Sequence, residues 1–304
     1  MTAPLAYLNG VWIDSQKLSV PVDDLGFLLG ATVVERMRTF AGQVFRADAH
    51  LRRLQQSLKI VGWNAPELCQ QVSTAIDELI HRNAPLFQQG DDWTVVVFIT
   101  PGKTPAATRP TVCVHGQPLP FHQWAQQFRT GLAAVVTDVR QVPGNCWPAE
   151  LKCRSRMHYY LADRQAEATT PGARAILLDQ SGHVGEASTA NVAAFFADRG
   201  LVTPRLAHVL PGISRQVLFE LATSLGIAHT EDDLLPEQLA AADEIFLTST
   251  SSCLLPVVQL NGQPVGTGAP GPIFQRLLAA WSELVGVDIE AQAVRLARRS
   301  VALD

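Results

Sequence analysis

Short β-type segments joined by tight turns recur along this chain and alternate with helical patterns, and this alternation constrains the fold most strongly. Asn9-Gly10 separates two apolar runs and Asn261-Gly262 separates two more, which is the strongest short-range signal for a β-hairpin. Similar turns are expected near Gly42, Ser181-Gly182 and Gly200. Such turns join antiparallel strands, whereas parallel strands need long crossovers. The sequence therefore predicts an α/β architecture of the α+β type, with largely antiparallel or mixed sheets and flanking helices, and not a doubly wound parallel sheet.

The first half of the chain has clear helical and strand patterns. A helix is predicted to begin at Asp48, as its N-cap, because the leucines that follow recur on one helix face. A second helix is predicted over residues 66–82, and strands over residues 94–100 and 111–115.

A length of 304 residues predicts two domains. Residues 116–121 follow neither the helical nor the strand period and contain two prolines, so we expect the boundary there. We predict an N-terminal α/β domain over residues 1–117, a linker over residues 118–129, and a C-terminal α/β domain over residues 130–304 that carries most of the candidate site.

Composition excludes several classes of function. The net charge is −4 and no run of lysines and arginines occurs, which argues against a nucleic-acid surface. No apolar stretch is long enough to span a membrane, and the N-terminus lacks the pattern of a signal peptide. The five cysteines are odd in number and lack metal-ligand spacing. We therefore expect a cytoplasmic protein with reduced thiols, no metal site, and no nucleic-acid or membrane partner.

Lysine is scarce in this chain, which has only Lys17, Lys59, Lys103 and Lys152. A lysine that attacks a carbonyl must be partly desolvated, so that its amine is neutral often enough to react. Lys17 lies in a polar connection, Lys59 on the outer face of the first long helix, and Lys103 in a Pro-Gly turn. Lys152 follows an irregular loop and precedes a predicted helix, which makes it the candidate for catalysis. The alternative is that it is a surface lysine.

Glu186 is the candidate carboxylate. It follows a predicted hairpin turn and has small residues on both sides, so a flat ring could approach it closely. A carboxylate that faces a pyridine nitrogen keeps that nitrogen protonated and makes the ring an electron sink. The alternative is an exposed hairpin glutamate.

Two segments could bind a phosphate group. Residues 211–214 open an amphipathic helix, where free N–H groups, the helix dipole and the Ser214 hydroxyl suit an anion. Residues 248–252 form a hydroxyl-rich turn that includes Thr250. Arg53, on the first long helix, could add a bidentate cationic contact. The alternatives are an ordinary helix start and a solvated helix arginine.

In their order and spacing these features resemble the class IV aminotransferase family, the fold-type IV pyridoxal-phosphate enzymes. That family includes branched-chain and D-amino-acid aminotransferases and aminodeoxychorismate lyases. The resemblance runs from the Leu8-Asn9-Gly10 hairpin to Gly271-Pro272, and it rests on these segments: residues 25–35, which end in Glu35; residues 45–54, which contain Arg53; Lys152; residues 184–191, which contain Glu186; residues 210–215; and residues 242–250.

The resemblance implies pyridoxal 5′-phosphate as the cofactor, with Lys152 at the Schiff-base position and Glu186 as the partner of the pyridine nitrogen. It implies that Arg53, the N–H groups of Ile213 and Ser214, and the hydroxyls of Ser214 and Thr250 bind the phosphate. It also implies two α/β domains with the cofactor in the cleft between them, and a homodimer in which each site receives residues from the neighbour. The substrates would be an amino acid and a 2-oxo acid.

Three arginines are candidates for substrate binding. Arg36 and Arg38 should share one face of a strand, because side chains alternate with a period of two. The resemblance places these two positions at the substrate pocket, where two arginines would suit one or two carboxylates. The alternative is a charged outer face. Arg156, expected one turn after Lys152 on a helix, is similar to an arginine of the lyase branch.

Three functions remain open from the sequence. A pyridoxal-phosphate-dependent aminotransferase comes first, with a 4-amino-4-deoxychorismate lyase that eliminates pyruvate as the second. A non-catalytic cofactor-binding protein is a remote third. The Gly102-Lys103-Thr104 triplet does not make a phosphate loop, because the glycine required five positions before Gly102 is Val97.

Overall fold

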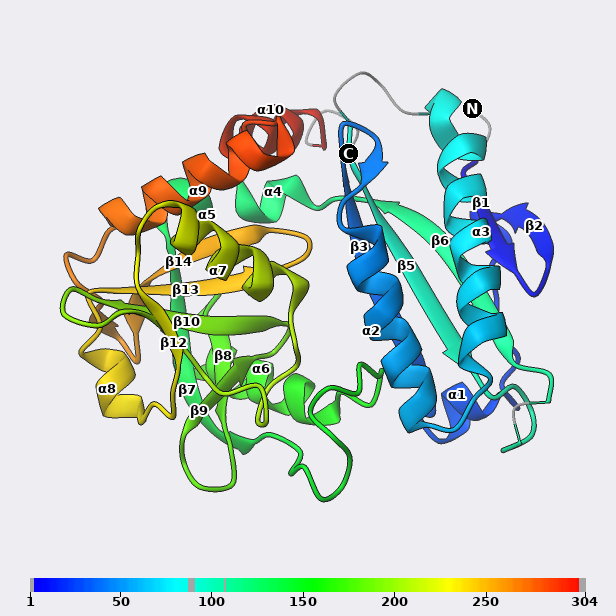
Figure 1. Cartoon of the computed structure of the whole chain (residues 1–304), viewed down its shortest axis with the longest axis horizontal. Coiled ribbons are helices and arrows are strands. Elements are labelled where there is room, and N and C mark those ends of the chain that lie inside the picture. Colours follow the sequence, from blue (N-terminus) through cyan, green and yellow to red (C-terminus); the bar gives the residue numbers. More distant parts are fainter. Residues whose placement is uncertain (1–2, 87–90, 107, 301–304) are drawn as a thin grey trace. The chain divides into compact units, whose positions relative to one another are not determined.

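The computed structural model describes residues 3–86, 91–106 and 108–300 of the chain. These residues form two compact units, which Figure 1 shows with the elements labelled. The first unit comprises Met1–Leu119 and Leu151–Ser155, and the second comprises Pro120–Glu150 and Arg156–Asp304.

The first unit is a six-stranded antiparallel sheet with its strands in the order β2-β1-β6-β5-β3-β4. Two long helices, α2 and α3, pack on one face of this sheet (Figure 1). Its elements have the following bounds: β1 Leu5–Leu8, β2 Val11–Asp14, η1 Ser15–Lys17, α1 Leu25–Leu28, β3 Val33–Phe40, β4 Gln43–Val44, α2 Ala47–Ile60, α3 Ala65–Asn83, η2 Ala84–Leu86, β5 Trp93–Thr100 and β6 Thr111–Pro118.

The two faces of β3 have different surroundings. Val33 and Met37 belong to the apolar core under α2 and α3, and because side chains alternate along a strand, Glu35 points to the same side. Arg36 and Arg38 occupy the other face of β3. The strand expected around these two arginines is therefore present, and it also places a glutamate on the core side of the sheet.

Local backbone geometry explains the hairpins. Asn9 and Gly10 both have positive φ angles, of 51° and 89°, and Asn261 and Gly262 have φ angles of 50° and 78°. Two consecutive residues with positive φ form the turn that matches the twist of two antiparallel strands, and asparagine and glycine adopt it at the lowest cost. The prediction of hairpins at both Asn-Gly pairs is confirmed.

One helix start differs from the prediction. The N-cap of α2 is Arg46, which has a left-handed backbone conformation, and Asp48 lies inside the first turn of the helix. Asp48 is therefore not the cap that we expected, although a carboxylate in a first turn is favoured by the helix dipole.

The second unit is built on a mixed sheet of nine strands. Strand β9 pairs with both β8 and β10, so six strands in the order β10-β13-β14-β7-β8-β9 close into a ring. Strands β11, β12 and β15 extend the ring. The strands have the following bounds: β7 Leu132–Arg140, β8 Arg174–Leu178, β9 Val184–Ala187, β10 Ala190–Phe196, β11 Gly200–Thr203, β12 His229–Glu231, β13 Glu244–Ser249, β14 Cys253–Leu260 and β15 Gln263–Pro264.

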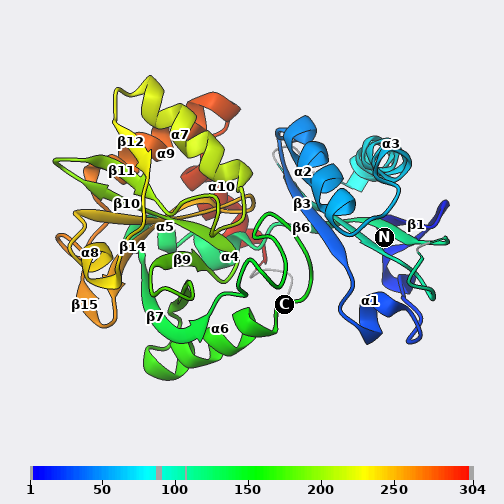
Figure 2. The same ribbon diagram turned by 60° about the horizontal axis from the view of Figure 1, so that its bottom comes forward.

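Helices cover this ring from more than one side. Helix α6 packs against β7 and β8, whereas α7 and α9 pack against β13. Figure 2 shows α6 beside β7. The helices of the second unit have the following bounds: α4 Phe121–Trp124, α5 Gln127–Thr130, α6 Met157–Thr169, α7 Ile213–Ser224, α8 Pro236–Ala240, α9 Pro272–Val285 and α10 Ile289–Ser300. Within the described residues, no helix combines the length and the apolar character that a membrane crossing requires.

The division into units differs from the predicted boundaries in two places. Where we expected a linker over residues 118–129, α4 and the start of α5 lie instead, because Phe121, Trp124 and Phe128 are buried in the second unit. Leu151–Ser155, which we assigned to the C-terminal domain, contacts the first unit, because it runs antiparallel to the start of β3.

Candidate active site

Lys152 is held by backbone contacts in the first unit. Its N–H donates to Ser57 Oγ on α2 at 3.1 Å, and its carbonyl accepts from Val34 N on β3 at 3.0 Å. The next residue, Cys153, forms a β-bridge with Val33. The backbone of Lys152 is therefore fixed between a helix and a strand, and its side chain is half-buried.

A buried charged cluster lies beside this segment. Glu35 has no exposed surface, and its carboxylate accepts from Arg53 through Nε at 3.0 Å and through Nη2 at 2.6 Å. The same carboxylate lies 3.0 Å from His50 Nδ1. Arg53, the predicted phosphate ligand, is 7% exposed. Two of its guanidinium nitrogens bind the carboxylate of Glu35, which lies on the core side of β3.

The charges in this cluster control its titration. Burial would raise the pKa of Glu35, but the charges and hydrogen bonds of Arg53 and His50 outweigh burial and hold that pKa well below its usual range. Burial lowers the pKa of His50; Glu35 opposes this, and the positive charges of Arg53 and Lys152 add to the lowering. The Lys152 amine is thus close enough to act on the titration of His50.

In the second unit, Glu186 lies on β9 and is 8% exposed. Its Oε1 accepts from the Tyr159 hydroxyl at 2.5 Å, and its Oε2 accepts from Leu210 N at 3.2 Å. Glu186 is therefore a buried and oriented carboxylate and not the exposed hairpin glutamate that was the alternative.

The strand register places a row of polar residues next to Glu186. Asn191 on β10 pairs with Glu186 on β9 and with Thr248 on β13, so these three side chains share one face of the sheet. Asn191 Nδ2 donates to the Leu210 carbonyl at 2.9 Å. Leu210 is therefore attached to this row by both its N–H and its carbonyl, and it leads directly into the start of α7.

The first turn of α7 contains Ile213 and Ser214, which are 8% and 6% exposed. The N–H groups of the first helical residues have no acceptor within the helix, and together with the helix dipole they favour an anion. The N-cap, Gly212, has no space for a side chain, because a Cβ atom there would overlap Asn191 Oδ1. The close approach of the Asn191 side chain to this helix start thus requires glycine at position 212.

Thr250 begins the turn after β13, two residues beyond Thr248 in the polar row. The turn is held by Ser249 Oγ and Ser252 Oγ, which lie 2.8 Å apart. The second unit therefore brings together three of the sequence-predicted groups: Glu186, the Ile213-Ser214 helix start and Thr250. The first unit brings together Lys152 and Arg53.

The substrate arginines have different environments. Arg36 is exposed, whereas Arg38 is 1% exposed and lies over the ring of Phe40, with 4.2 Å from Cζ to the ring centroid. Across the sheet from Arg36 is His115, whose pKa falls to about 4 because of burial and of the positive charges of Arg154 and Arg36. The face of this sheet that carries Arg36 and Arg38 is therefore cationic.

Arg156, which we expected on a helix one turn after Lys152, does not lie within a helix. It is the N-cap of α6, and residues 151–155 before it are not helical, because they pair with β3. Sequence reasoning also missed Tyr159, Asn191 and His50. Asn191 stands in the segment that identified Glu186, but its contact with Leu210 joins residues 19 positions apart, and no local pattern predicts such a contact.

The residues present fit a phosphorylated pyridine. A phosphate group needs hydrogen-bond donors, and these are available from the N–H groups at the start of α7 after Gly212 and from the hydroxyls of Ser214 and Thr250. Glu186 is a buried acceptor suited to a protonated ring nitrogen. Among the described residues, no group of three or more metal-binding side chains could hold a metal ion.

Comparison with known proteins gives a consistent result. The chain is 26% identical to the D-alanine aminotransferase of Bacillus licheniformis over 281 residues, which covers 90% of this chain and 94% of the relative. It is 28% identical to the branched-chain-amino-acid aminotransferase of Escherichia coli K12 over 294 residues, which covers 92% of each. A branched-chain aminotransferase structure from Thermoproteus uzoniensis superimposes with a TM-score of 0.81 at 26% identity and covers 93% of this chain and 95% of that one.

These relatives carry aminotransferase names, which favours transamination over the lyase alternative. The model of the amino-transferase class IV family matches residues 32–260, a span that includes β3, Lys152, Glu186 and the start of α7. The chain therefore belongs to the class IV aminotransferase family and is a transaminase.

Proposed function

We propose that this transaminase binds pyridoxal 5′-phosphate through Lys152 and Glu186 and moves an amino group between an amino acid and a 2-oxo acid. The observation that carries the proposal is the buried carboxylate of Glu186, oriented by Tyr159 and Leu210 beside the start of α7. Class IV aminotransferases depend on this cofactor. When bound, it supplies an electron sink for the carbon that loses and gains a proton.

Each proposed cofactor contact has a defined chemical role. Glu186 would hold a proton at the ring nitrogen, because an ionised carboxylate favours the protonated form of a neighbouring base. The Ile213 and Ser214 N–H groups and the hydroxyls of Ser214 and Thr250 would bind the phosphate group. Arg53 would add a cation whose orientation is already set by the fork onto Glu35.

Lys152 would hold the cofactor covalently until the amino group of the substrate displaces it, and its released amine would then act as the general base. Its backbone is fixed by Ser57 and Val34, so its amine needs to search few positions. The amine would take the proton from the α-carbon of the bound amino acid and later give it back at a neighbouring carbon.

The cationic face of the first unit supports a substrate that carries a carboxylate. Arg36 is exposed on β3, and Arg38 is prepositioned on the same face by Phe40. We propose that these two arginines, with Arg156 as a weaker candidate, recognise substrate carboxylate groups.

A half-reaction screen tests the proposed function. Purified protein is loaded with pyridoxal 5′-phosphate, mixed with single L- and D-amino acids, and followed by absorbance for conversion of the aldehyde cofactor into its amine. Lys152→Ala is expected to lose both covalent cofactor attachment and conversion. Retention of both activities by this variant would refute the assignment. Production of pyruvate and p-aminobenzoate without an amino acceptor would instead indicate the lyase.

We also propose that the enzyme is a cytoplasmic homodimer. Phe27, Leu28 and Leu29 form an apolar surface around α1, with exposed fractions of 73%, 58% and 70%, and contiguous apolar surface of this kind is typical of protein interfaces. The five cysteines are thiols, which fits a reducing compartment. Sedimentation of the wild type and of Phe27→Ser tests the dimer, because the variant should shift toward a monomer.

A further inference from the structure

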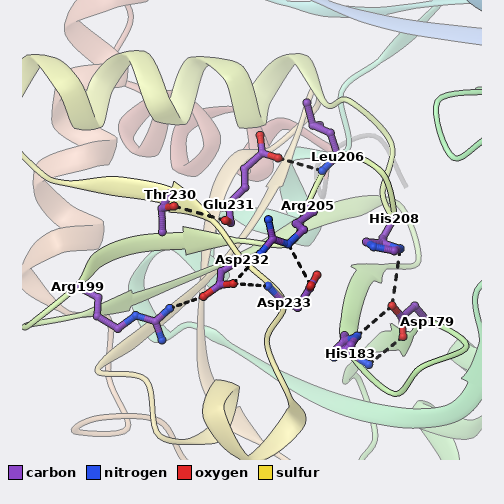
Figure 3. Close-up of polar contacts among 10 residues, drawn as sticks. All are labelled: Asp179, His183, Arg199, Arg205, Leu206, His208, Thr230, Glu231, Asp232 and Asp233. Carbon is purple, nitrogen blue, oxygen red and sulfur yellow. Dashed lines mark hydrogen bonds and ion pairs between the residues drawn. The ribbon is translucent and has the colours of Figure 1, made fainter.

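The start of α7 is reached through a segment without regular structure. Residues 204–212 connect β11 to α7 and contain neither helix nor strand, so side-chain contacts determine where the helix begins. Figure 3 shows three residues of this segment in polar contact with their surroundings. Leu206 N lies 3.1 Å from Glu231 Oε2, and His208 Nδ1 lies 3.7 Å from Asp179 Oδ2. Arg205 donates through Nε to Asp233 Oδ2 at 3.0 Å and through Nη2 to Asp232 Oδ1 at 3.1 Å.

Another contact comes from the helix itself. Arg215 is the third residue of α7, and its Nε and Nη2 donate to Thr203 Oγ1 at 3.1 and 2.9 Å. Its Nη2 also lies 2.7 Å from Glu231 Oε1. Thr203 and Glu231 are paired across the parallel strands β11 and β12, each at the end of its strand. Arg215 therefore binds the helix start to the last residue pair of a sheet edge.

Burial separates this contact from the others. The Arg215 side chain is 6% exposed and Thr203 has no exposed surface, whereas the Arg205 and Asp233 side chains are 49% and 35% exposed. Solvent screens exposed ion pairs, and their long side chains lose conformational freedom on pairing, so such pairs restrain a segment weakly. The buried contact of Arg215 with Thr203 can therefore hold the first turn of α7 in place, together with the contacts of Leu210 to Glu186 and Asn191.

The position of Arg215 is not explained by helix stability. A cation in the first turn of a helix is opposed by the helix dipole, which favours negative charge there. Glu231 offsets part of that opposition, because its carboxylate lies 2.7 Å from the Arg215 guanidinium, and an anion bound at the helix start would interact favourably with the dipole itself. The unfavourable placement of Arg215 is thus relieved in part by Glu231, and the helix start remains suited to a phosphate group.

We propose that Arg215 is a positioning residue that holds the N–H groups of Ile213 and Ser214 in place for the phosphate group of the cofactor. The residue acts through Thr203 and Glu231 and does not itself touch the phosphate. This inference rests on the proposed function, which assigns the phosphate to the start of α7.

Arg215→Lys tests the proposal, because lysine keeps the charge and loses the fork onto Thr203 and Glu231. Dissociation constants are measured for pyridoxal 5′-phosphate, for inorganic phosphate, and for pyridoxal, which lacks the phosphate group. The variant should bind the two phosphate-bearing probes about tenfold more weakly, as for the loss of one charged hydrogen bond, and bind pyridoxal as the wild type does. At saturating cofactor its kcat should match that of the wild type.

Arg205→Lys is the matched control, since it changes an exposed arginine on the same segment and should leave all three affinities unchanged. Equal weakening of pyridoxal binding in Arg215→Lys, or unchanged phosphate binding with reduced thermal stability, would overturn the proposal. If Arg215→Lys does not fold, Thr203→Val can replace it, because it removes the oxygen that accepts from both guanidinium nitrogens. This variant should also bind the two phosphate-bearing probes more weakly and bind pyridoxal as the wild type does.

Binding measurements on the wild type separate the role proposed for Arg215 from the proposed cofactor. Wild-type protein that binds inorganic phosphate but not pyridoxal 5′-phosphate would refute the proposed cofactor and leave the role of Arg215 to be decided by phosphate affinity. Wild-type protein that binds neither probe would refute both.

Discussion

Replacing Glu35 by glutamine should destabilise the first unit far more than a surface substitution of the same kind. The variant Glu35→Gln keeps the size and shape of the side chain but removes its charge. The Arg53 guanidinium, which is 7% exposed, then loses the charge onto which two of its N–H groups are forked. The glutamine amide can also present N–H groups toward donors.

The expected magnitude follows from burial. Removing one partner of a buried ion pair typically costs about 3–5 kcal/mol, because the remaining charge stays in a low-dielectric surrounding. The pair of Glu78 and Arg82 on α3 is the matched control, since both side chains are 40% exposed. A surface pair of this geometry is worth about 0.3–0.5 kcal/mol, so Glu78→Gln should change little.

Hydrogen exchange by mass spectrometry measures this difference unit by unit. Amides of α2 and β3 should exchange more than about 100-fold faster in Glu35→Gln, since each 1.4 kcal/mol is a factor of ten. Peptides from β13 and α9 in the second unit serve as the internal reference. A change in α2 and β3 no larger than that in Glu78→Gln would refute the reasoning that burial makes this pair strong.

The destabilisation caused by Glu35→Gln should depend on pH. The folded pKa of Glu35 lies below its ordinary value of 4.5, so its contribution to stability is fully present above that pH and decreases as the pH falls below it. The difference in stability between wild type and Glu35→Gln should therefore be constant above about pH 5.5 and shrink at lower pH. A difference that grows on acidification would contradict the assigned direction.

Three further predictions concern the candidate site. Tyr159→Phe removes a hydroxyl that donates to Glu186 and should weaken binding of pyridoxal 5′-phosphate by roughly tenfold or more, as for a hydrogen bond to a charged group, measured by fluorescence titration. Gly212→Ala places a Cβ against Asn191 Oδ1 and should lower the affinity for inorganic phosphate. Gly226→Ala, beyond the far end of α7, has room for the Cβ but strains a φ of 68°, so it should lower stability and leave that affinity unchanged. Arg36→Gln removes a positive charge that acts on His115, so the pKa of His115 should rise from about 4 in an NMR titration; an unchanged or lower value would show that Arg36 does not act on it.

Much of the local structure could be predicted from the sequence because it is set by neighbouring residues. The two Asn-Gly hairpins and the alternation along β3 depend on φ preferences and on side-chain periodicity, which a single sequence displays. The parallel pairing of β7 with β14 joins residues more than 100 positions apart, and no pattern in either strand identifies its partner.

The same distinction holds for the candidate site. Lys152 and Glu186 stand in short segments with a recognisable composition, so they could be proposed as site residues. The hydrogen bond from Tyr159 to Glu186 depends on how α6 packs near β9, and the contact between His50 and Glu35 depends on how α2 lies on β3. Arg156, which was expected on a helix, is the N-cap of α6 instead, and the β-bridge of Cys153 with Val33 just before it could not be predicted from local sequence.

Closure of the six strands has a consequence for the precision of the carboxylate at position 186. A strand at the open edge of a sheet can slip by one residue, which turns every side chain to the opposite face. Strand β9 is laddered on both of its sides, to β8 and to β10, although it is only four residues long. A shift in the register of β9 would have to break its hydrogen bonds to both neighbouring strands at once. Closure of the ring therefore fixes the face of the sheet to which Glu186 points.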